Sequence, residues 1–397
     1  MEIGLVGKPN VGKSTFFEAA TLAGVEIANY PFTTIKANKG MGYLRAPDPG
    51  KDLGVASQPR NSIVLDDIRL VPVELLDVAG LVPDAHTGKG LGNQFLDDLR
   101  QAKALIHIVD VSGSTDEEGN PVDPGSHDPA KDIGFLQKEI DHWFLSIIKK
   151  DWTKISRMSE STHTPIEKLL SEKVTGLGIN IHHITDAIHH LHLDDRAAHW
   201  SDQQLMDLSM ELRKNSKPMI IAANKADKAT DEMIENLTGS AEDYMVIPTC
   251  SEAEMALRRA DKAGLIDYVP GDSEFIIKDP SKLNSQQLHA LDKIKEILDR
   301  FGSTNVQKVL EKAAYDLLDL IVLYPVEDEH KFTDHDGRVL PDAHLMRNGS
   351  TAKDLAYKVH SDLGDNFIKA IDCRKQRTIG ADHELENGDV VKIHSHS

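Results

Sequence analysis

The sequence has few cysteines and no long apolar run. Its 397 residues include only two cysteines, Cys250 and Cys373, far apart and outside any CxxC pattern, so neither a disulfide framework nor a thiolate zinc site is expected. The longest apolar stretches, such as ALIHIV, fall well short of the ~20 residues that cross a bilayer. The N-terminus shows no signal-peptide pattern. We therefore expect a protein of the reducing cytoplasm with no membrane partner.

Basic residues are in the minority. The sequence has 45 Lys and Arg residues and 64 Asp and Glu residues, which gives a net charge of −19. This charge argues against a protein whose whole surface binds nucleic acid. Any RNA contact must be local, as at Arg374, Lys375 and Arg377, although so small a cluster is usually solvated charge. The apolar share of 40% is ordinary for a globular protein, and the length predicts more than one domain.

Hydrophobic patterns predict an α/β domain that is interrupted by helices. Strand-like runs occur at residues 3–6, 71–76, 104–110, 218–223 and 244–248, and they alternate with helical patterns. This order predicts a doubly wound, mainly parallel sheet with helices on both faces. Residues 120–215 give no strong strand signal, and their apolar residues follow the helical period. We interpret this stretch as an α-helical insertion.

The C-terminal part has a different pattern. Two amphipathic segments within residues 285–320 are followed by short strands around a helix that starts with a Ser/Thr cap, which predicts a small α+β module. The predicted divisions are residues 1–128 for the first part of the α/β domain, 129–215 for the insertion, 216–318 for the second part with linking helices, and 319–397 for the C-terminal module.

The segment GKPNVGKST lies between the first strand and the first helix. It contains the pattern GxxxxGKS, in which backbone N–H groups and the helix N-terminus surround phosphates. Lys13 would reach the β- and γ-phosphates, and Ser14 would ligate Mg²⁺. The alternative is a glycine-rich turn that only caps a helix, but such a turn needs neither the lysine nor the serine side chain. The residues assigned to the nucleotide here are Gly7, Asn10, Val11, Gly12, Lys13, Ser14 and Thr15.

The segment NKAD follows the apolar strand PMIIAA and is the candidate base site. The Asp227 carboxylate can accept hydrogen bonds from the ring N–H and the exocyclic amine of guanine, and adenine offers no such pair. A charged acceptor left unpaired by the wrong base costs several kcal/mol. The alternative is an ordinary loop after a strand. We assign Asn224, Lys225 and Asp227 to the base, with Cys250 and Ser251 as a further contact.

Two more segments contain candidate Mg²⁺ ligands. The run DVAG, from Asp77 to Gly80, supplies a carboxylate for the metal's water shell and a glycine N–H that can sense a γ-phosphate. In NYPFTT we favour Thr34 over Thr33 as a ligand, although these hydroxyls can also cap a strand. The predicted metal-binding residues are therefore Ser14, Thr34 and Asp77.

The combination of GKPNVGKST, PFTT, DVAGLVPDAHTGKGLG and NKAD resembles the Obg/YchF family of translation-associated GTPases, in its archaeal type. The C-terminal module, from LIVLYPVED to GDVVKIHS, is similar to that family's ubiquitin-like β-grasp unit, the TGS domain. The resemblance implies a P-loop NTPase G domain that binds GTP or GDP with Mg²⁺, slow GTP hydrolysis, and a ribosome or ribosomal RNA partner contacted through the TGS and helical domains. We expect a monomer. The helical insertion is similar only in kind.

The sequence departs from the family pattern at two motifs. Bacterial and eukaryotic YchF-type members typically end the base motif in glutamate and favour ATP, whereas Asp227 predicts guanine. The fifth motif, usually Ser-Ala, is Cys250-Ser251 here, which alters the serine's support for the base.

The attacking water must be positioned by an unusual group, because Leu81 follows DVAG where many regulatory GTPases have glutamine. Asn10 matches an asparagine that in related GTPases helps hold a K⁺ ion on the phosphates. His86 is a second candidate, although a histidine in a polar loop is more often a bystander. The predicted catalytic set is Lys13, Thr34, Gly80, His86 and Asn10.

Other interpretations stay open. One alternative is a P-loop kinase acting on a small acceptor, which NKAD and the C-terminal module disfavour. The other is an RNA-binding adaptor with a structural nucleotide.

A histidine-rich stretch suggests a metal site, but adjacent histidines point to different faces of a helix and no acidic or cysteine partner completes a pattern. Its histidines are His182, His183, His189, His190 and His192.

Overall fold

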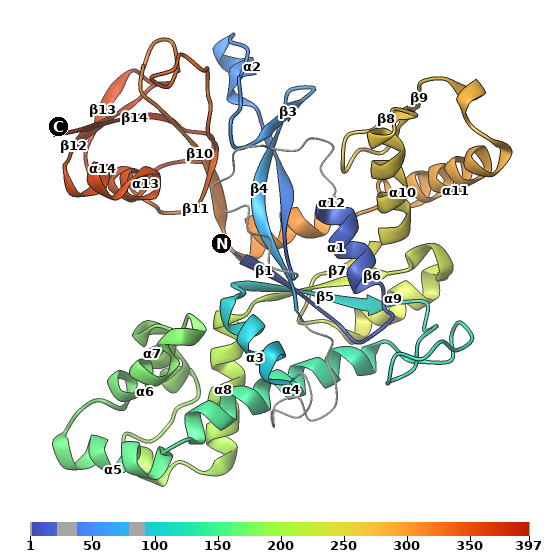
Figure 1. Cartoon of the computed structure of the whole chain (residues 1–397). Helices are drawn as coiled ribbons and strands as arrows, with labels where there is room; N and C mark the ends of the chain where they lie inside the picture. The colour runs from blue at the N-terminus through green and yellow to red at the C-terminus, as the bar shows by residue number, and fades with distance from the viewer. Residues whose placement is uncertain (1, 22–37, 79–91, 397) are drawn as a thin grey trace.

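A seven-stranded sheet forms the centre of the molecule (Figure 1). The computed structural model describes residues 2–21, 38–78 and 92–396. The strands lie in the order β2, β4, β1, β5, β6, β7, with β3 paired to β4. The pairs from β4 to β7 are parallel, whereas β2 and β3 are antiparallel to β4. Their bounds are β1 (Glu2–Val6), β2 (Lys39–Pro47), β3 (Ile63–Leu65), β4 (Ile68–Asp77), β5 (Ala104–Asp110), β6 (Met219–Asn224) and β7 (Val246–Thr249).

Helices cover both faces of this sheet, as predicted. Every residue of β5 and β6 is buried, which is why these strands are continuous apolar runs rather than alternating ones. On one face, Phe16 of α1 and Val309 of α12 pack in one core with Leu5. The helices of this domain are α1 (Lys13–Thr21), α2 (Pro49–Leu53), α3 (Gly92–Gln101), α9 (Asp231–Ser240), α10 (Ser251–Lys262), α11 (Ser285–Phe301) and α12 (Val306–Glu311), which continues as the π-helix η6 (Lys312–Leu317).

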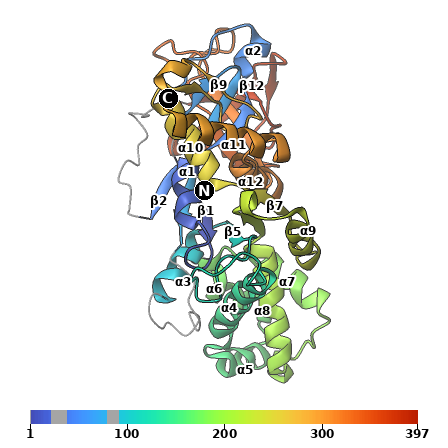
Figure 2. The ribbon, with the colours of Figure 1, turned by 90° about the vertical axis from the view of Figure 1, so that its right-hand side faces the viewer.

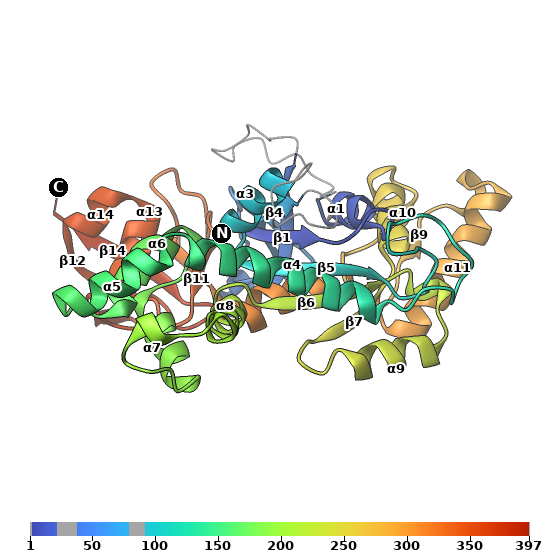
Figure 3. The same ribbon diagram turned by 90° about the horizontal axis from the view of Figure 1, so that it is seen from below.

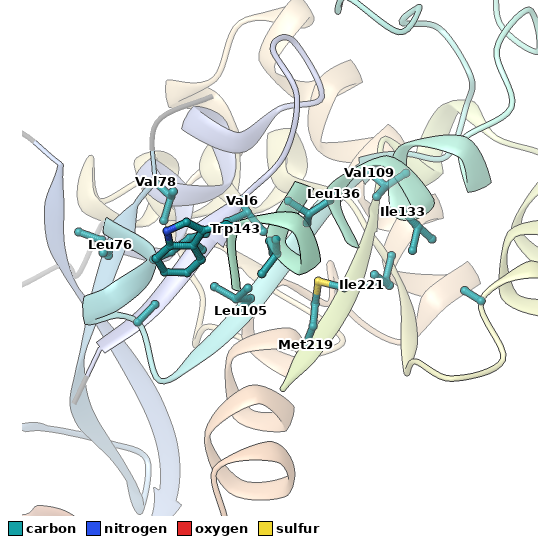
Figure 4. Packing of buried hydrophobic residues seen from close by; sticks show 14 of the residues in the cluster. Val6, Leu76, Val78, Leu105, Val109, Ile133, Leu136, Trp143, Met219 and Ile221 are labelled. Atoms are coloured by element: carbon teal, nitrogen blue, oxygen red, sulfur yellow. The ribbon is translucent and has the colours of Figure 1, made fainter. Parts of the chain in front are cut away.

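The predicted insertion is helical. It lies below the sheet in Figure 1 and is seen from below in Figure 3. Ile133, Leu136 and Trp143 of its first helix pack against Val6 and Leu105 of the sheet (Figure 4), so insertion and sheet share one core. The helices are α4 (Ala130–Lys149), α5 (Trp152–Thr162), α6 (Ile166–Val174), α7 (Ile181–His190) and α8 (Asp202–Ser216).

The C-terminal module is a five-stranded β-grasp sheet in the order β11, β10, β14, β12, β13. Thr351 caps the covering helix by accepting a hydrogen bond from the backbone N–H of Asp354, as the Ser/Thr start predicts. The elements are β10 (Leu320–Val326), β11 (His344–Arg347), α13 (Ala352–Val359), α14 (Ser361–Asp365), β12 (Phe367–Asp372), β13 (Arg377–Ile379) and β14 (Val390–Ser395).

The C-terminal module packs on the outer end of β2 and β4 (Figure 1). Arg69 of β4 is fully buried there. Its guanidinium donates to Ser62 Oγ at 2.7 Å and to the Leu340 carbonyl at 2.7 Å, and it pairs with Asp48 at 3.2 Å. A small hairpin, β8 (Ile266–Asp267) and β9 (Ile276–Ile277), lies between α10 and α11 along the chain.

Candidate nucleotide-binding site

The phosphate loop, Asp77 and the NKAD segment meet at the carboxyl ends of the parallel strands. The order of the strands reverses beside β1, and ligands of α/β sheets bind at such a point. A pocket of about 610 Å³ opens there. It is lined by Lys8, Pro9, Asn10, Gly12, Lys13, Ser14, Thr15, Asn224, Lys225, Asp227, Lys228, Ser251 and Glu252.

The phosphate loop is tightly built around its glycines. Gly12 has φ +94°, and a Cβ there would lie 2.2 Å from Asn224 Nδ2. A Cβ on Gly7 would lie 2.6 Å from the Ile108 carbonyl oxygen. Side chains are therefore excluded at both positions. Gly7 and the fully buried Val11 were assigned to the nucleotide but do not line the pocket.

Lys13 and Ser14 begin α1 at the mouth of the pocket. The Lys13 ammonium forms an ion pair with Asp77, the last residue of β4. Ser14 is exposed at the positive N-terminal end of the helix. The Ser14 hydroxyl and the Asp77 carboxylate are the hard oxygen donors that Mg²⁺ prefers, so this pair of residues fits the predicted metal.

Several predicted residues lie outside the described part of the chain. They are Thr34, Gly80 and His86, and the disfavoured Thr33 and the water-incompetent Leu81 also lie there. Their assignments to Mg²⁺, the γ-phosphate and the attacking water stay predictions.

Asn224 joins the base motif to the phosphate loop. Its side chain is buried and donates from Nδ2 to the Val11 carbonyl at 2.8 Å. Its Oδ1 accepts from Ser251 N at 3.1 Å and from Ser251 Oγ at 2.8 Å. One amide thus fixes segments that follow three different strands. The side chain of Asp227, in the 3-10 turn Ala226–Lys228, is exposed and lines the pocket.

Lys225 is held by a residue that sequence reasoning missed. It has φ +60°, and its Nζ donates to Asp110 Oδ2 at 2.7 Å. Asp110, the buried last residue of β5, also accepts from the hydroxyls of Ser112 and Ser114. Burial alone would raise the pKa of Asp110, but the hydrogen bonds from Lys225 and the serines lower it. The sequence feature that could have identified Asp110 is its position at the end of a strand, directly before VSGST.

Cys250 supports the site without lining it. Its thiol is buried, and burial followed by the Asp227 charge raises its pKa to about 12, so it is neutral at pH 7. Its N–H donates to the Thr304 carbonyl at 2.9 Å. The turn that carries Asp227 is also held by Arg300 of α11, which donates to the carbonyls of Ala226 at 3.2 Å and Ala229 at 3.0 Å. Arg300 was not predicted because it is distant in sequence.

The connection at residues 113–129 is rich in Gly, Pro and Asp, a composition typical of exposed turns, yet it is only partly exposed. Thr115 is buried, and the Gly119 carbonyl accepts a hydrogen bond from Asn10 Nδ2 at 2.9 Å. Asn10 itself has φ +64°. This loop therefore packs against the phosphate loop.

The weaker sequence candidates have ordinary structural partners. His183 belongs to the capping box of α7, and His190 lies 3.3 Å from Glu211. Within the described residues, no group of three or more His, Cys, Asp or Glu side chains is arranged to hold a metal. No helix in that part of the chain is long and apolar enough to span a membrane.

The basic patch of the C-terminal module is paired with acidic groups. Arg374 lies 3.7 Å from Asp52, and Arg377 lies 3.7 Å from Asp372. Lys375 lies 3.3 Å from Glu386. These pairs reduce the charge available for RNA.

Three family descriptions match the chain. Residues 2–141 match a family described as 50S ribosome-binding GTPase, and residues 222–328 match the Obg-like GTPase YGR210-like, G4 motif-containing domain. Residues 332–395 match the TGS domain.

Similar proteins extend over the whole chain, including the insertion. The uncharacterized GTP-binding protein MJ1332 of Methanocaldococcus jannaschii is 53% identical over 98% of both chains. A crystal structure of a GTP-binding protein from Pyrococcus horikoshii is 44% identical, covers 100% of both chains and has a TM-score of 0.80. The ribosome-binding ATPase YchF of Bacillus subtilis is 25% identical over 98% of this chain and 97% of its own.

Proposed function

We propose that this chain, which belongs to the Obg-like GTPase family of the MJ1332 type, binds GTP with Mg²⁺ and hydrolyses it to GDP and phosphate. Its relatives carry both GTP-binding and ATPase names, so the nucleotide must be argued from the base site. The observation that carries the proposal is Asp227, an exposed carboxylate that lines the same pocket as the phosphate loop.

The base site supports guanine through charge and rigidity. Asp227 presents an anionic acceptor, and a carboxylate can take both guanine donors at once. Its turn is fixed by Arg300 and by the neighbouring Lys225–Asp110 pair. Adenine would leave the carboxylate unpaired, and an unpaired charged acceptor disfavours the wrong ligand strongly.

The phosphate site supports hydrolysis through positioning and charge. Lys13 and the N-terminal end of α1 provide positive charge where the β- and γ-phosphates would lie. Ser14 and Asp77 would hold Mg²⁺, which neutralises charge on the phosphate oxygens when bound. Asn10 remains our candidate for holding K⁺, and His86 for orienting the attacking water.

Product analysis tests this proposal. Purified protein is incubated with Mg²⁺ and either GTP or ATP, and the nucleotides and free phosphate are quantified by chromatography. We expect GDP and phosphate in equal amounts, faster than from ATP, with no added acceptor. A Lys13→Met variant controls for contaminating phosphatases. Turnover that favours ATP, or that needs a small acceptor as a kinase would, contradicts the proposal.

We also propose that the protein is a switch on the ribosome or on a translation factor. The support is the family description of residues 2–141 and the ribosome-binding name of the Bacillus subtilis relative. The TGS domain and the helical insertion are the proposed contact regions. In a switch, the segments around Thr34 and Gly80 would change their contacts when the γ-phosphate is lost.

A further inference from the structure

The phosphate loop contains a second lysine, and its charge is held inside the protein. Lys8 is 6% exposed. Its Nζ donates to the Thr115 carbonyl at 3.0 Å and lies 2.8 Å from Asp132 Oδ2. A phosphate-binding pattern does not require a lysine at this position, so its burial calls for a separate reason.

The partner carboxylate belongs to the helical insertion. Asp132 is in the first turn of α4 and is also buried. Its other oxygen, Oδ1, lies 2.8 Å from His127 Nε2. The charge of Lys8 also acts on the buried His107 of β5. Burial and the Lys8 charge lower the pKa of His107 to about 3, so the ring is neutral and adds no second cation beside Lys8.

Backbone contacts join the same two regions. Asn10 donates to the Gly119 carbonyl, and a Cβ on Gly119 would lie 2.5 Å from the Pro9 carbonyl oxygen. The loop that leads to α4 therefore lies directly on the phosphate loop. The loop follows β5, whose last residue, Asp110, holds Lys225 of the base motif.

We propose that Lys8 and Asp132 are a positioning pair that fixes the shape of the phosphate loop and couples it to α4 of the helical insertion. The inference rests on the proposed function only in that the phosphate loop binds a nucleotide. Nucleotide binding then restrains the start of α4. Coupling between two sites is reciprocal. If bound nucleotide changes the affinity of the insertion for a partner by some factor, a partner bound to the insertion changes the nucleotide affinity by that same factor.

A neutral double variant separates positioning from simple stability. Removing one member of a buried ion pair leaves an unpaired charge and destabilises the fold strongly, whereas removing both is often nearly neutral. Lys8→Met/Asp132→Asn should therefore recover much of the melting temperature that either single variant loses. If the pair only stabilises the fold, nucleotide binding recovers as well. If it positions the loop, nucleotide binding does not recover.

The test uses the full chain, both single variants, the double variant and the control Lys131→Met, which removes an exposed lysine next to Asp132. Each is measured for melting temperature, for Mg²⁺·GDP and Mg²⁺·ADP affinity, and for amide hydrogen exchange at residues 130–136 with and without nucleotide. We expect nucleotide to slow exchange there in the unmodified chain and in the control. In the double variant, affinity should fall at least about fivefold and the slowing should be lost.

Two results overturn the pair: a double variant that keeps both affinity and slowed exchange, or an unmodified chain whose α4 exchange ignores bound nucleotide. Binding of ADP but not GDP would refute the base assignment alone, because the ADP measurements still test the pair. Binding of neither nucleotide refutes both proposals.

Discussion

At the residue scale, Asp110 connects the base motif to the sheet. Its lowered pKa means that folding favours the carboxylate, so the stability that it contributes is present above the unfolded pKa of about 3.9 and is lost as the pH falls through the folded value. We expect Asp110→Asn to lower the free energy of unfolding by roughly 1–3 kcal/mol at pH 7.

Denaturant titrations from pH 7 to pH 3 check this prediction. The difference between the unmodified chain and Asp110→Asn should narrow below about pH 4. Asp123→Asn, at an exposed position of the same loop, should change stability by no more than about 0.5 kcal/mol. A difference for Asp110→Asn that is constant across the pH range would show that its hydrogen bonds do not favour the charged form.

Asn10 gives a second residue-scale prediction. If Asn10 helps to hold K⁺ beside the phosphates, GTP turnover should be at least about tenfold faster in K⁺ than in Na⁺ at equal ionic strength, which corresponds to about 1.4 kcal/mol of barrier. Asn10→Ala should remove most of the difference. Identical turnover of the unmodified chain in the two salts removes K⁺ from the account.

Site residues that belong to short sequence motifs were predictable. Residues that hold those motifs in place through hydrogen bonds or ion pairs were not. Lys13 and Asp227 stand in short motifs whose spacing indicates their chemistry. Asp110 and Arg300 support those motifs from distant parts of the chain, and only the fold brings them close. Lys8 lies within the phosphate loop, but its partner Asp132 is distant in sequence.

At the scale of elements, β4 and its partner β2 differ in how well the sequence predicts them. Its inner half was predicted as a strand, but its antiparallel partner β2 was not, because KGMGYLRAP contains two glycines and ends in proline and has little β-propensity. The short strands β11 to β13 carried too little pattern to be found one by one. The core strands and the insertion helices were predictable because their apolar periodicity extends over many residues.

Arg69 tests whether the outer end of β4 anchors the C-terminal module. Arg69→Met removes the donor to the Leu340 carbonyl of the module and leaves Asp48 without its buried ionic partner, so we expect a loss of about 3–5 kcal/mol of unfolding free energy. The matched variant Arg60→Met removes a half-exposed pair with Asp342 at the same interface and should cost about 0–1 kcal/mol. Denaturant unfolding measures both variants. Equal losses would mean that the burial of Arg69 adds nothing to the anchoring.

At the scale of the whole molecule, the G-domain sheet lies between two attached units (Figure 2). The order of α/β domain, insertion and TGS module was predictable from pattern changes along the chain. The docking of residues 113–129 on the phosphate loop was not, because a stretch rich in Gly, Pro and Asp predicts only a turn.

The proposed switch predicts nucleotide-dependent association with ribosomes. Purified protein is sedimented with archaeal ribosomes in the presence of GDP or a non-hydrolysable GTP analogue. We expect several-fold more protein in the pellet with the analogue. Equal and low amounts with both nucleotides would remove the ribosome from the proposal and leave the nucleotide site unaffected.

The most direct test of the central claim measures the affinities of GTP, ATP and xanthosine triphosphate for the unmodified chain and for Asp227→Asn. Xanthine carries a carbonyl where guanine carries its amine, so an amide at position 227 should favour it. We predict that the unmodified chain binds GTP at least about a hundredfold more tightly than ATP, and that Asp227→Asn loses GTP and gains xanthosine triphosphate. Equal binding of GTP and ATP by the unmodified chain would contradict the account.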